Sequence, residues 1–160
     1  MPGTEHQAPR QIKPSSLDDY LEVMSKSVFQ TGISWAVVEK KWPGTKEAFR
    51  GFDVGAVAGL GEKEIANLVE DTRIIRNRRK IEGIVSNARQ LIELDDRHGS
   101  FQKYLRSHAD FDALLKSLRK EFKFLGDMGS YHFLYVVKES VPPYDEFCEM
   151  YGAKSRVAAK

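Results

Sequence analysis

The sequence predicts an all-α fold, a compact bundle of about nine short helices, from three observations. Apolar residues recur three and four positions apart over most of the chain, as the buried face of a helix requires. A serine or an aspartate stands directly before several of these segments, where its side chain can cap a helix. Only residues 131–137 have the composition of a β-strand, and a lone strand has no partner, so we expect helix there too.

The first two helices are separated by a tight turn. Ser16 (or Ser15) can cap a helix that starts at Leu17. The turn is built around Gly32, and Ser34 can cap the following helix. Pro43 is expected to end or kink that second helix near Trp42, because proline lacks the N–H of the helical ladder.

The remaining helices have equally local signals. Asp53 can cap the short segment VGAVAGL, and Asp110 can cap FDALLKSLRKEF. Between them, residues 79–94 carry a near-continuous apolar stripe that Gly99 closes. The last helix follows Pro142 and Pro143, since proline is favoured at a helix start.

Composition limits the class of protein. The chain has 160 residues, of which 41% are hydrophobic and 30% charged, which suits one globular domain. We expect a flexible arm at residues 1–14, a single helical domain at 15–151 and a polar tail at 152–160. Because 25 basic residues nearly balance 23 acidic ones, any nucleic-acid site must be a local patch.

The single cysteine and the lack of long apolar runs exclude further classes. Cys148 alone cannot form a disulfide framework or a zinc site that needs two cysteines, and we interpret it as a small buried hydrophobe. No apolar run approaches the roughly 20 residues of a membrane span, and the N-terminus lacks the apolar stretch of a signal peptide. We therefore expect a cytoplasmic, monomeric protein without metal, cofactor or membrane contact.

The segment FKFLGDMGSYHF indicates a helix-hairpin-helix motif. Leu125 can anchor the turn, and Gly126 and Gly129 flank Asp127 and Met128. Glycines leave the backbone open to a phosphate, and the N–H groups of a following helix, including that of Ser130, can bind it. Lys123 is a basic neighbour. The alternative is an ordinary helix connection with a glycine cap.

Two longer stretches carry a family resemblance. These are FQTGISWAVVEKKWPGTKEAFRGFD and IANLVEDTRIIRNRRKIEGIVSNARQLI, followed later by KFLGDMGSYHF. The chain resembles the 3-methyladenine DNA glycosylase I family, of the helix-hairpin-helix DNA glycosylases, over roughly Ser16–Leu94 and Glu121–Val137. The resemblance implies a DNA glycosylase that removes alkylated or damaged purines from double-stranded DNA in base-excision repair.

Two departures from the family pattern bear on its chemistry. Family members carry cysteine and histidine ligands of a structural zinc, whereas here only Cys148 and the scattered His6, His98, His108 and His132 are present. The family also has a glutamate eight residues before the tryptophan of its GLSW turn. Counting back eight from Trp35 gives Ser27, so the substrate-binding position has no carboxylate.

The resemblance assigns roles around the Gly32 turn. Ile33 matches the family's wedge, which fills the gap left by an extruded base. Trp35 is the expected stacking surface for that base, and Tyr20, Met24 and Gln30 are expected to line the same pocket. The alternative is that Trp35 and Met24 are plain core residues, since aromatic and apolar side chains are usually buried for packing.

Asp145 is the expected catalytic carboxylate. Other helix-hairpin-helix glycosylases place an aspartate after the hairpin helix in a Pro-x-Asp context, and Pro143-Tyr144-Asp145 resembles it. A carboxylate near the sugar can stabilise an oxocarbenium-like transition state or activate water. The alternative is a helix-start aspartate favoured by the dipole. Tyr131 stands where lyase-competent relatives carry a lysine, so we expect a monofunctional enzyme.

A basic cluster precedes the long central helix. Arg73, Arg76, Arg78, Arg79 and Lys80 place five positive charges within eight residues. We expect phosphate contacts from this cluster, above all from Arg76 and Arg78. The alternative is a solvated helix start. His132, in the hairpin's second helix, is expected to be a packed or capped core histidine.

The sequence leaves two further functions open. One is a non-catalytic helix-hairpin-helix module that recognises damaged DNA, which Ser27 and the missing zinc ligands favour. The other is a helical interaction domain without a DNA role, for which the near-neutral charge is the only support.

Overall fold

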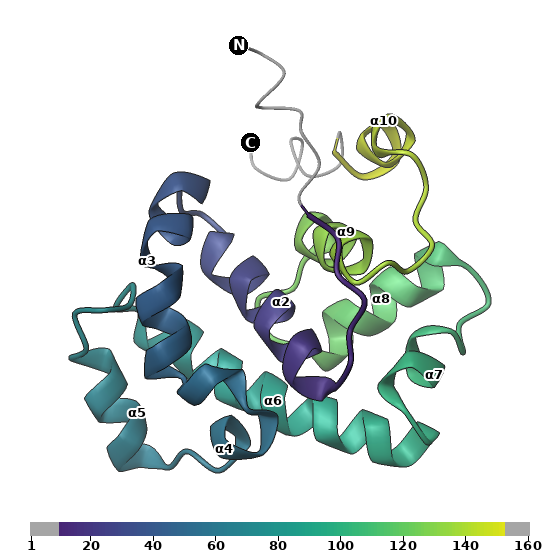
Figure 1. Ribbon diagram of the computed structural model, residues 1–160. Helices are drawn as coiled ribbons and strands as arrows, with labels where there is room; N and C mark the ends of the chain where they lie inside the picture. The colour runs from purple at the N-terminus through teal and green to yellow at the C-terminus, as the bar shows by residue number, and fades with distance from the viewer. Residues whose placement is uncertain (1–9, 153–160) are drawn as a thin grey trace.

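The computed structural model describes residues 10–152 (Figure 1). Over this part of the chain it contains nine α-helices, one short 3-10 helix, η1, and one π-helical turn, η2. In chain order they are α2 (Leu17–Gln30), α3 (Trp35–Ala48), η1 (Arg50–Phe52), α4 (Val54–Ala58), α5 (Glu62–Val69), α6 (Arg78–His98), α7 (Phe101–Leu105), α8 (Phe111–Glu121), α9 (Asp127–Val136), α10 (Tyr144–Phe147) and η2 (Cys148–Gly152). The all-α prediction is confirmed.

The long helix α6 is the centre of the packing. It runs along the lower part of Figure 1 and contacts α2, α4, α5 and α7. Its buried face includes Ile81, Ile84, Ala88 and Leu91, which recur at helical spacing. Helix α2 crosses above α6 and also packs against α9, so it links the two halves of the fold.

The hairpin helices form the second half. Helix α8 contacts α9, and η2 folds back onto α9. The core here is aromatic: Tyr20 of α2 meets Phe101 at 5.0 Å and Phe133 of α9 at 6.2 Å between ring centroids. These contacts fix the separation of α2 and α9, the helices on either side of the site described below.

Side-chain caps begin the helices where the sequence predicts them. The hydroxyls of Ser16 and Ser34 accept from backbone N–H groups in the first turns of α2 and α3, and the carboxylates of Asp53 and Asp110 do so for α4 and α8. Gly99 ends α6 with a φ of 89°, a left-handed conformation that favours glycine.

Helix α3 continues through Pro43 to Ala48, so the proline does not end it, the first of the two alternatives expected from the sequence. The Thr45 hydroxyl donates to the Lys41 carbonyl at 2.8 Å within the same turn. Next to the proline, Gly44 allows a close approach of the chain after α5. A Cβ on Gly44 would lie 3.0 Å from the Arg73 Cβ, so only glycine fits without displacing that segment.

The chain before α2 lies against α9. The Ile12 N–H donates to the Val136 carbonyl at 2.8 Å, and the Gln11 side chain donates to the Tyr135 carbonyl at 2.9 Å. Gln11 and Ile12, within the arm expected at 1–14, are therefore attached to α9. Residues 1–9 and 153–160 lie outside the described residues, and with them most of both expected termini. None of the helices in the described region has the length and apolar character to cross a membrane.

Candidate functional site

Two adjoining cavities lie between α2, α3 and α9. The larger has a volume of about 590 Å³ and the smaller about 420 Å³. Ser27, Gln30, Trp35 and His132 line both, so these four residues mark the junction. The smaller cavity extends to the hairpin at Gly126–Gly129. Both volumes fall within the roughly 300–1,000 Å³ of small-molecule sites, which leaves room for a nucleobase.

Trp35 is a surface residue of these cavities and not a core anchor. It is the first residue of α3, directly after the Ser34 cap, and 46% of its surface is exposed. Gly32, three residues earlier, has a φ of 77°, which makes the tight turn possible. Trp42 provides the contrast: it is buried, stacks on Phe52 at 5.3 Å and donates to Glu22 at 3.0 Å.

Lys80 holds the end of α2 and thereby the turn before Trp35. Its ammonium donates to the carbonyls of Phe29, at 3.3 Å, and Thr31. These carbonyls lie at the negative end of the α2 dipole, where a cation is favourable. Burial lowers the pKa of Lys80. Lys80 therefore positions the Trp35 turn. It is too buried for the phosphate contact that the sequence suggested for the basic cluster.

Ser27 and Gln30 form the α2 wall of the junction. Ser27 is 7% exposed and faces α9. A Cβ built on Gly129 of α9 would lie 3.9 Å from the Cβ of Ser27. The Gln30 amide nitrogen is buried, and it has no hydrogen-bond partner among residues 10–152. A buried donor without a partner costs stability, and a ligand that supplies an acceptor recovers it.

Tyr20 and Met24 lie elsewhere. Both are buried in the core on the other face of α2 and line neither cavity. For Met24, this is the core alternative considered from the sequence. For Tyr20, the helical spacing predicted α2 correctly, but the packing turns its ring towards Phe101 and Phe133 and away from the cavities.

The hairpin presents a bare helix N-terminus to the smaller cavity. Gly126 is the N-cap of α9, and over the described residues no side chain caps this end. A Cβ on Gly126 would meet nothing within 4 Å, so its backbone is open to a ligand. Neither Gly126 nor Gly129 has a positive φ; in this loop Phe124 does, with a φ of 58°. The glycines therefore provide access, while Phe124 makes the bend.

Asn87 fixes the hairpin to α6. Its side chain is 1% exposed, accepts from the Lys123 N–H at 2.8 Å and donates to the Lys123 carbonyl at 3.1 Å. Gly83, one turn earlier, has no side chain to displace Phe124, which would lie 3.0 Å from a Cβ there. The Lys123 side chain is exposed beside the hairpin, as expected.

Two DNA contacts expected from the sequence have a different geometry. Ser130 is fully buried: its N–H donates to the Gly126 carbonyl at 2.8 Å and its hydroxyl to the Leu125 carbonyl at 3.4 Å, so neither group is available to a phosphate. Ile33 is half-buried and packs against the core. Met128, at the hairpin tip, is 37% exposed and lines the smaller cavity, which makes it a second apolar candidate beside the expected wedge.

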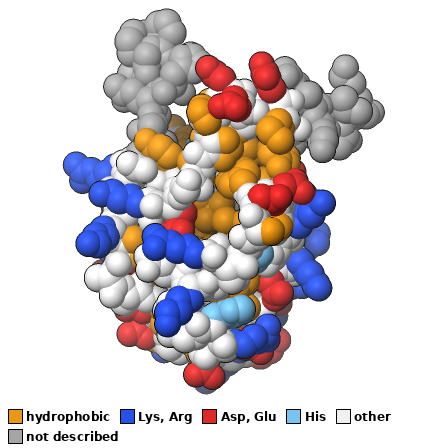
Figure 2. Space-filling view, turned by 90° about the vertical axis from the view of Figure 1, so that its right-hand side faces the viewer, with side chains coloured by type: hydrophobic (Ala, Val, Ile, Leu, Met, Phe, Trp, Pro, Cys, Tyr) orange, Lys and Arg blue, Asp and Glu red, His pale blue; other side chains and the backbone are white. Residues whose placement is uncertain are grey.

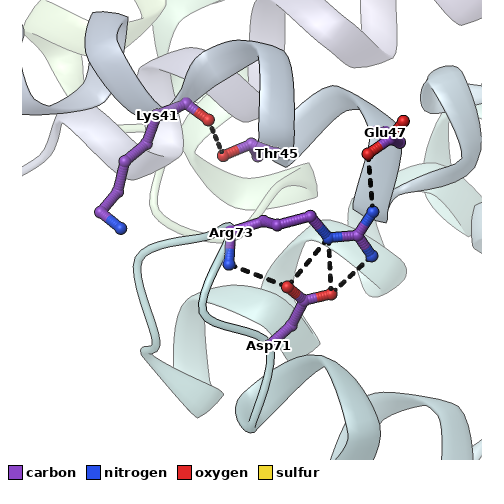
Figure 3. A network of polar contacts seen from close by, with 5 residues as sticks. All are labelled: Lys41, Thr45, Glu47, Asp71 and Arg73. Carbon is purple, nitrogen blue, oxygen red and sulfur yellow. Dashed lines mark hydrogen bonds and ion pairs between the residues drawn. The ribbon is translucent and has the colours of Figure 1, made fainter.

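Most of the basic cluster is already paired. Arg73 binds Asp71 and Glu47 in the network of Figure 3, with its guanidinium 2.7 Å from Asp71 and 2.9 Å from Glu47. Arg78 pairs with Glu62 and Glu82. Glu47 and Glu62 come from other parts of the sequence, whereas Asp71 and Glu82 are near neighbours of the arginines. Together they offset the charge of the basic cluster.

Arg76 and Arg79 differ from the other members of the cluster. Arg76 is exposed and makes no hydrogen bond or ion pair within residues 10–152. The Arg79 guanidinium lies 5.9 Å from the Phe124 ring, above the hairpin bend. Arg76 is therefore the better candidate for a phosphate contact than Arg78.

Asp145 lies in the first turn of α10 and is exposed. It lines neither cavity. Apolar side chains gather in the upper part of the face that carries α7, α8 and α10 (Figure 2). Near Asp145 in the sequence, Tyr144 of α10 and Met150 of η2 are exposed. The carboxylates that do line the larger cavity are those of Asp19, Glu22 and Glu39.

His132 is a cavity residue, contrary to the core position expected from the sequence. It lines both cavities, with its ring 6.1 Å from Trp35 and 6.5 Å from Tyr144. Burial lowers its pKa, which favours the neutral imidazole. Helical spacing alone could not reveal this, because the partner helices α2 and α3 come from a distant part of the sequence.

The part of the chain that the structure describes holds no group of three or more metal-ligating side chains. His6 lies outside it. Cys148 is half-buried against the core, in keeping with the interpretation as a small hydrophobe.

A hairpin with an open helix N-terminus, beside an exposed tryptophan and a cavity that admits a nucleobase, defines a glycosylase-like helical protein. More particularly, the chain belongs to the methyladenine glycosylase family, whose sequence model matches residues 13–125. It is 32% identical to DNA-3-methyladenine glycosylase 1 of Escherichia coli (strain K12) over 126 residues, 66% of this chain and 67% of the relative.

Solved structures agree with this assignment. The 3-methyladenine DNA glycosylase I of Staphylococcus aureus is similar, with a TM-score of 0.70 and 27% identity over 80% of this chain and 79% of that one. A variant of 3-methyladenine DNA glycosylase I in complex with 3-methyladenine has a TM-score of 0.70 and 27% identity, over 85% and 83% of the two chains.

Proposed function

We propose that this chain is a DNA glycosylase that removes alkylated purines of the 3-methyladenine kind by hydrolysing the N-glycosidic bond, a step of base-excision repair. Membership of the methyladenine glycosylase family supports the proposal. The observation that carries it is the exposed Trp35 at the junction of two cavities, one of which opens at the hairpin. The partner is double-stranded DNA that contains a damaged base, and the protein acts as a cytoplasmic monomer.

Phosphate binding falls to the backbone of the hairpin. The first N–H groups of α9 have no side-chain acceptor in the described structure, and they carry the positive end of the helix dipole. A DNA phosphate next to Gly126 would accept from them directly. The Asp127 carboxylate in the same turn opposes this, but Arg119 lies 2.8 Å from it and offsets its charge.

Base binding falls to Trp35. Extruding a base costs a few kcal/mol, and stacking on an aromatic face returns about 1–3 kcal/mol. An alkylated, cationic purine gains a further cation–π attraction on the indole. Ile33, on the turn after Gly32, or Met128, which lines the smaller cavity, can fill the vacated stack.

The bond cleavage itself needs little acid catalysis. A cationic purine leaves with the electron pair of the glycosidic bond, and the oxygen of a water molecule adds to the sugar carbon and loses its proton. A carboxylate near the sugar stabilises the positive charge that develops there and accepts that proton. Asp145 remains the proposed carboxylate, on the grounds of its sequence context after Pro143. Tyr131 is buried with its hydroxyl on the Pro142 carbonyl at 2.7 Å, so it offers no amine for a lyase step.

The test is release of free base from methylated duplex DNA under single-turnover conditions. Trp35→Ala should lower the rate at least about fivefold, since a stacking contact of about 1–3 kcal/mol is lost. Val37→Ala is the matched control, because Val37 is an equally exposed apolar residue of α3 that lines neither cavity. Equal rates for Trp35→Ala and the wild type would refute the proposal.

Asp145→Asn tests the carboxylate in the same assay. We expect a loss of at least tenfold, with Glu149→Gln, an exposed acid of the adjoining turn, as the control. An unchanged rate for Asp145→Asn would remove Asp145 from the mechanism and direct attention to Glu39, an exposed carboxylate that lines the larger cavity.

A second candidate function is a non-catalytic module that recognises damaged DNA. Ser27 in place of the family's glutamate, together with an Asp145 that lines neither cavity, favours it. Such a module would bind duplex DNA with an abasic site but would release no base from methylated DNA. Binding combined with base release would exclude it.

A further inference from the structure

The cavity wall on α2 lacks a charged group where the family has one. Ser27 is short, faces α9 and stands where the family's glutamate is expected. A hydroxyl cannot reach or attract a base as a carboxylate does. If this cavity reads a base, the polar contact comes from another residue.

The polar groups around the cavities divide into paired and unpaired ones. Glu22 binds Trp42 and Lys46, Glu39 pairs with Lys26, and Asp19 accepts from Ser15. In contrast, the ring nitrogens of His132 make no hydrogen bond within residues 10–152, and the buried Gln30 amide nitrogen has none either. His132 and the Gln30 amide nitrogen both line the junction of the cavities.

His132 stands opposite the α2 wall. It lies three residues after Gly129, on the same face of α9, and Gly129 is the point where α9 comes close to Ser27. Its ring meets Trp35 edge-on, with 63° between the planes and 6.1 Å between the centroids. A base stacked on the indole face would therefore have the imidazole beside its edge.

We propose that His132 is the specificity-determining residue of this cavity: its imidazole hydrogen-bonds the edge of the extruded purine, with the Gln30 amide as a second contact. The inference rests on the proposed function and deepens it. A neutral imidazole offers one donor and one acceptor and carries no charge. Recognition by His132 is thus by hydrogen bonding, and Trp35 senses the positive charge of an alkylated purine.

The same geometry predicts a pH dependence. Burial keeps His132 neutral at pH 7, and protonation at lower pH would place a positive charge next to a cationic base. The ring neighbours are Tyr131 and Tyr144. The charged groups that face the same cavities are Arg10, Asp19, Glu22, Lys26, Glu39 and Asp127.

Three measurements on the full chain test the role of His132. We expect His132→Phe, which keeps a ring, to slow base release from methylated duplex DNA about tenfold, the value of one hydrogen bond. His132→Gln, which keeps a donor and an acceptor, should stay within about threefold of the wild type and lose the fall in rate between pH 7.5 and pH 5. Affinity for a duplex with an abasic site, which has no base to contact, should stay within about twofold in both variants.

The outcomes separate the inference from the proposed function. Equal rates for His132→Phe and the wild type would overturn the inference and leave the proposed function standing. A loss of abasic-site affinity in both variants would also overturn it, because that loss indicates a structural role for His132. If the wild type releases no base, the proposed function fails, and titration with free 3-methyladenine, followed by tryptophan fluorescence, decides the inference. Binding that His132→Phe abolishes would support it, and no binding by the wild type would overturn it.

Discussion

The contact between Asn87 and the hairpin allows a quantitative prediction. Asn87 is almost fully buried on α6, and its amide both donates to and accepts from the backbone of Lys123. Asn87→Ala removes both hydrogen bonds and leaves an N–H and a carbonyl of the loop without their partner. Each such loss costs about 1–1.5 kcal/mol in a partly buried site, so we expect unfolding free energy to fall by about 2–3 kcal/mol.

Urea unfolding followed by circular dichroism measures this change. With a denaturant slope of about 2 kcal/mol/M, the midpoint should fall by about 1–1.5 M. The same variant should bind abasic-site duplex less tightly, because the loop that presents Gly126 loses its attachment to α6.

Ser86→Ala is the matched control. Ser86 precedes Asn87 on α6 and makes no hydrogen bond through its side chain within the described residues, so the unfolding free energy of Ser86→Ala should stay within about 0.5 kcal/mol of the wild type. If Asn87→Ala unfolds at the wild-type urea concentration, the two hydrogen bonds do not hold the hairpin and the reasoning is refuted.

Three further predictions concern charge. Asp127→Asn should raise affinity for abasic-site duplex at least threefold in fluorescence anisotropy, because it removes a carboxylate from the α9 N-terminus and frees Arg119; weaker binding would contradict this. Arg76→Ala should lower the slope of log affinity against log salt by about one. Arg78→Ala should leave the slope unchanged, because Arg78 is already paired with two glutamates. Equal slopes for the two variants would contradict the assignment of the phosphate contact to Arg76. Burial lowers the pKa of His132 from its ordinary value of 6.5. The unfolded chain therefore binds more protons than the folded one at acidic pH, and the free energy of unfolding decreases as the pH is lowered. His132→Gln should lose less stability than the wild type in urea unfolding between pH 7.5 and pH 5, and an equal loss would show that another group is responsible.

Local chemistry made the helices predictable. Ser16, Ser34, Asp53 and Asp110 cap the helices that follow them because each bonds a backbone N–H two or three residues away. The residues after Pro43 were the exception, since α3 continues where the sequence suggested an end or a kink. The position of Trp35 at a helix start after the Gly32 turn was predictable in the same way.

Contacts between distant segments decided the rest of the site. Glu62 removes Arg78 from the candidate phosphate contacts, Lys80 turns inward to the end of α2, and Tyr20 joins the aromatic core. His132 reaches the cavities only because α9 packs beside α2. Each of these depends on which elements meet in space.

The sequence by itself determined the helical class, most helix starts, the Gly32 turn and the hairpin, because these depend on spacing and capping within a few residues. Only the tertiary structure decided which charges are neutralised and which polar groups remain unpaired at the cavity. The physical reason is that pairing and burial depend on neighbours from other elements, such as Glu22 with Trp42 and Asn87 with Lys123, whose distances the local pattern does not contain.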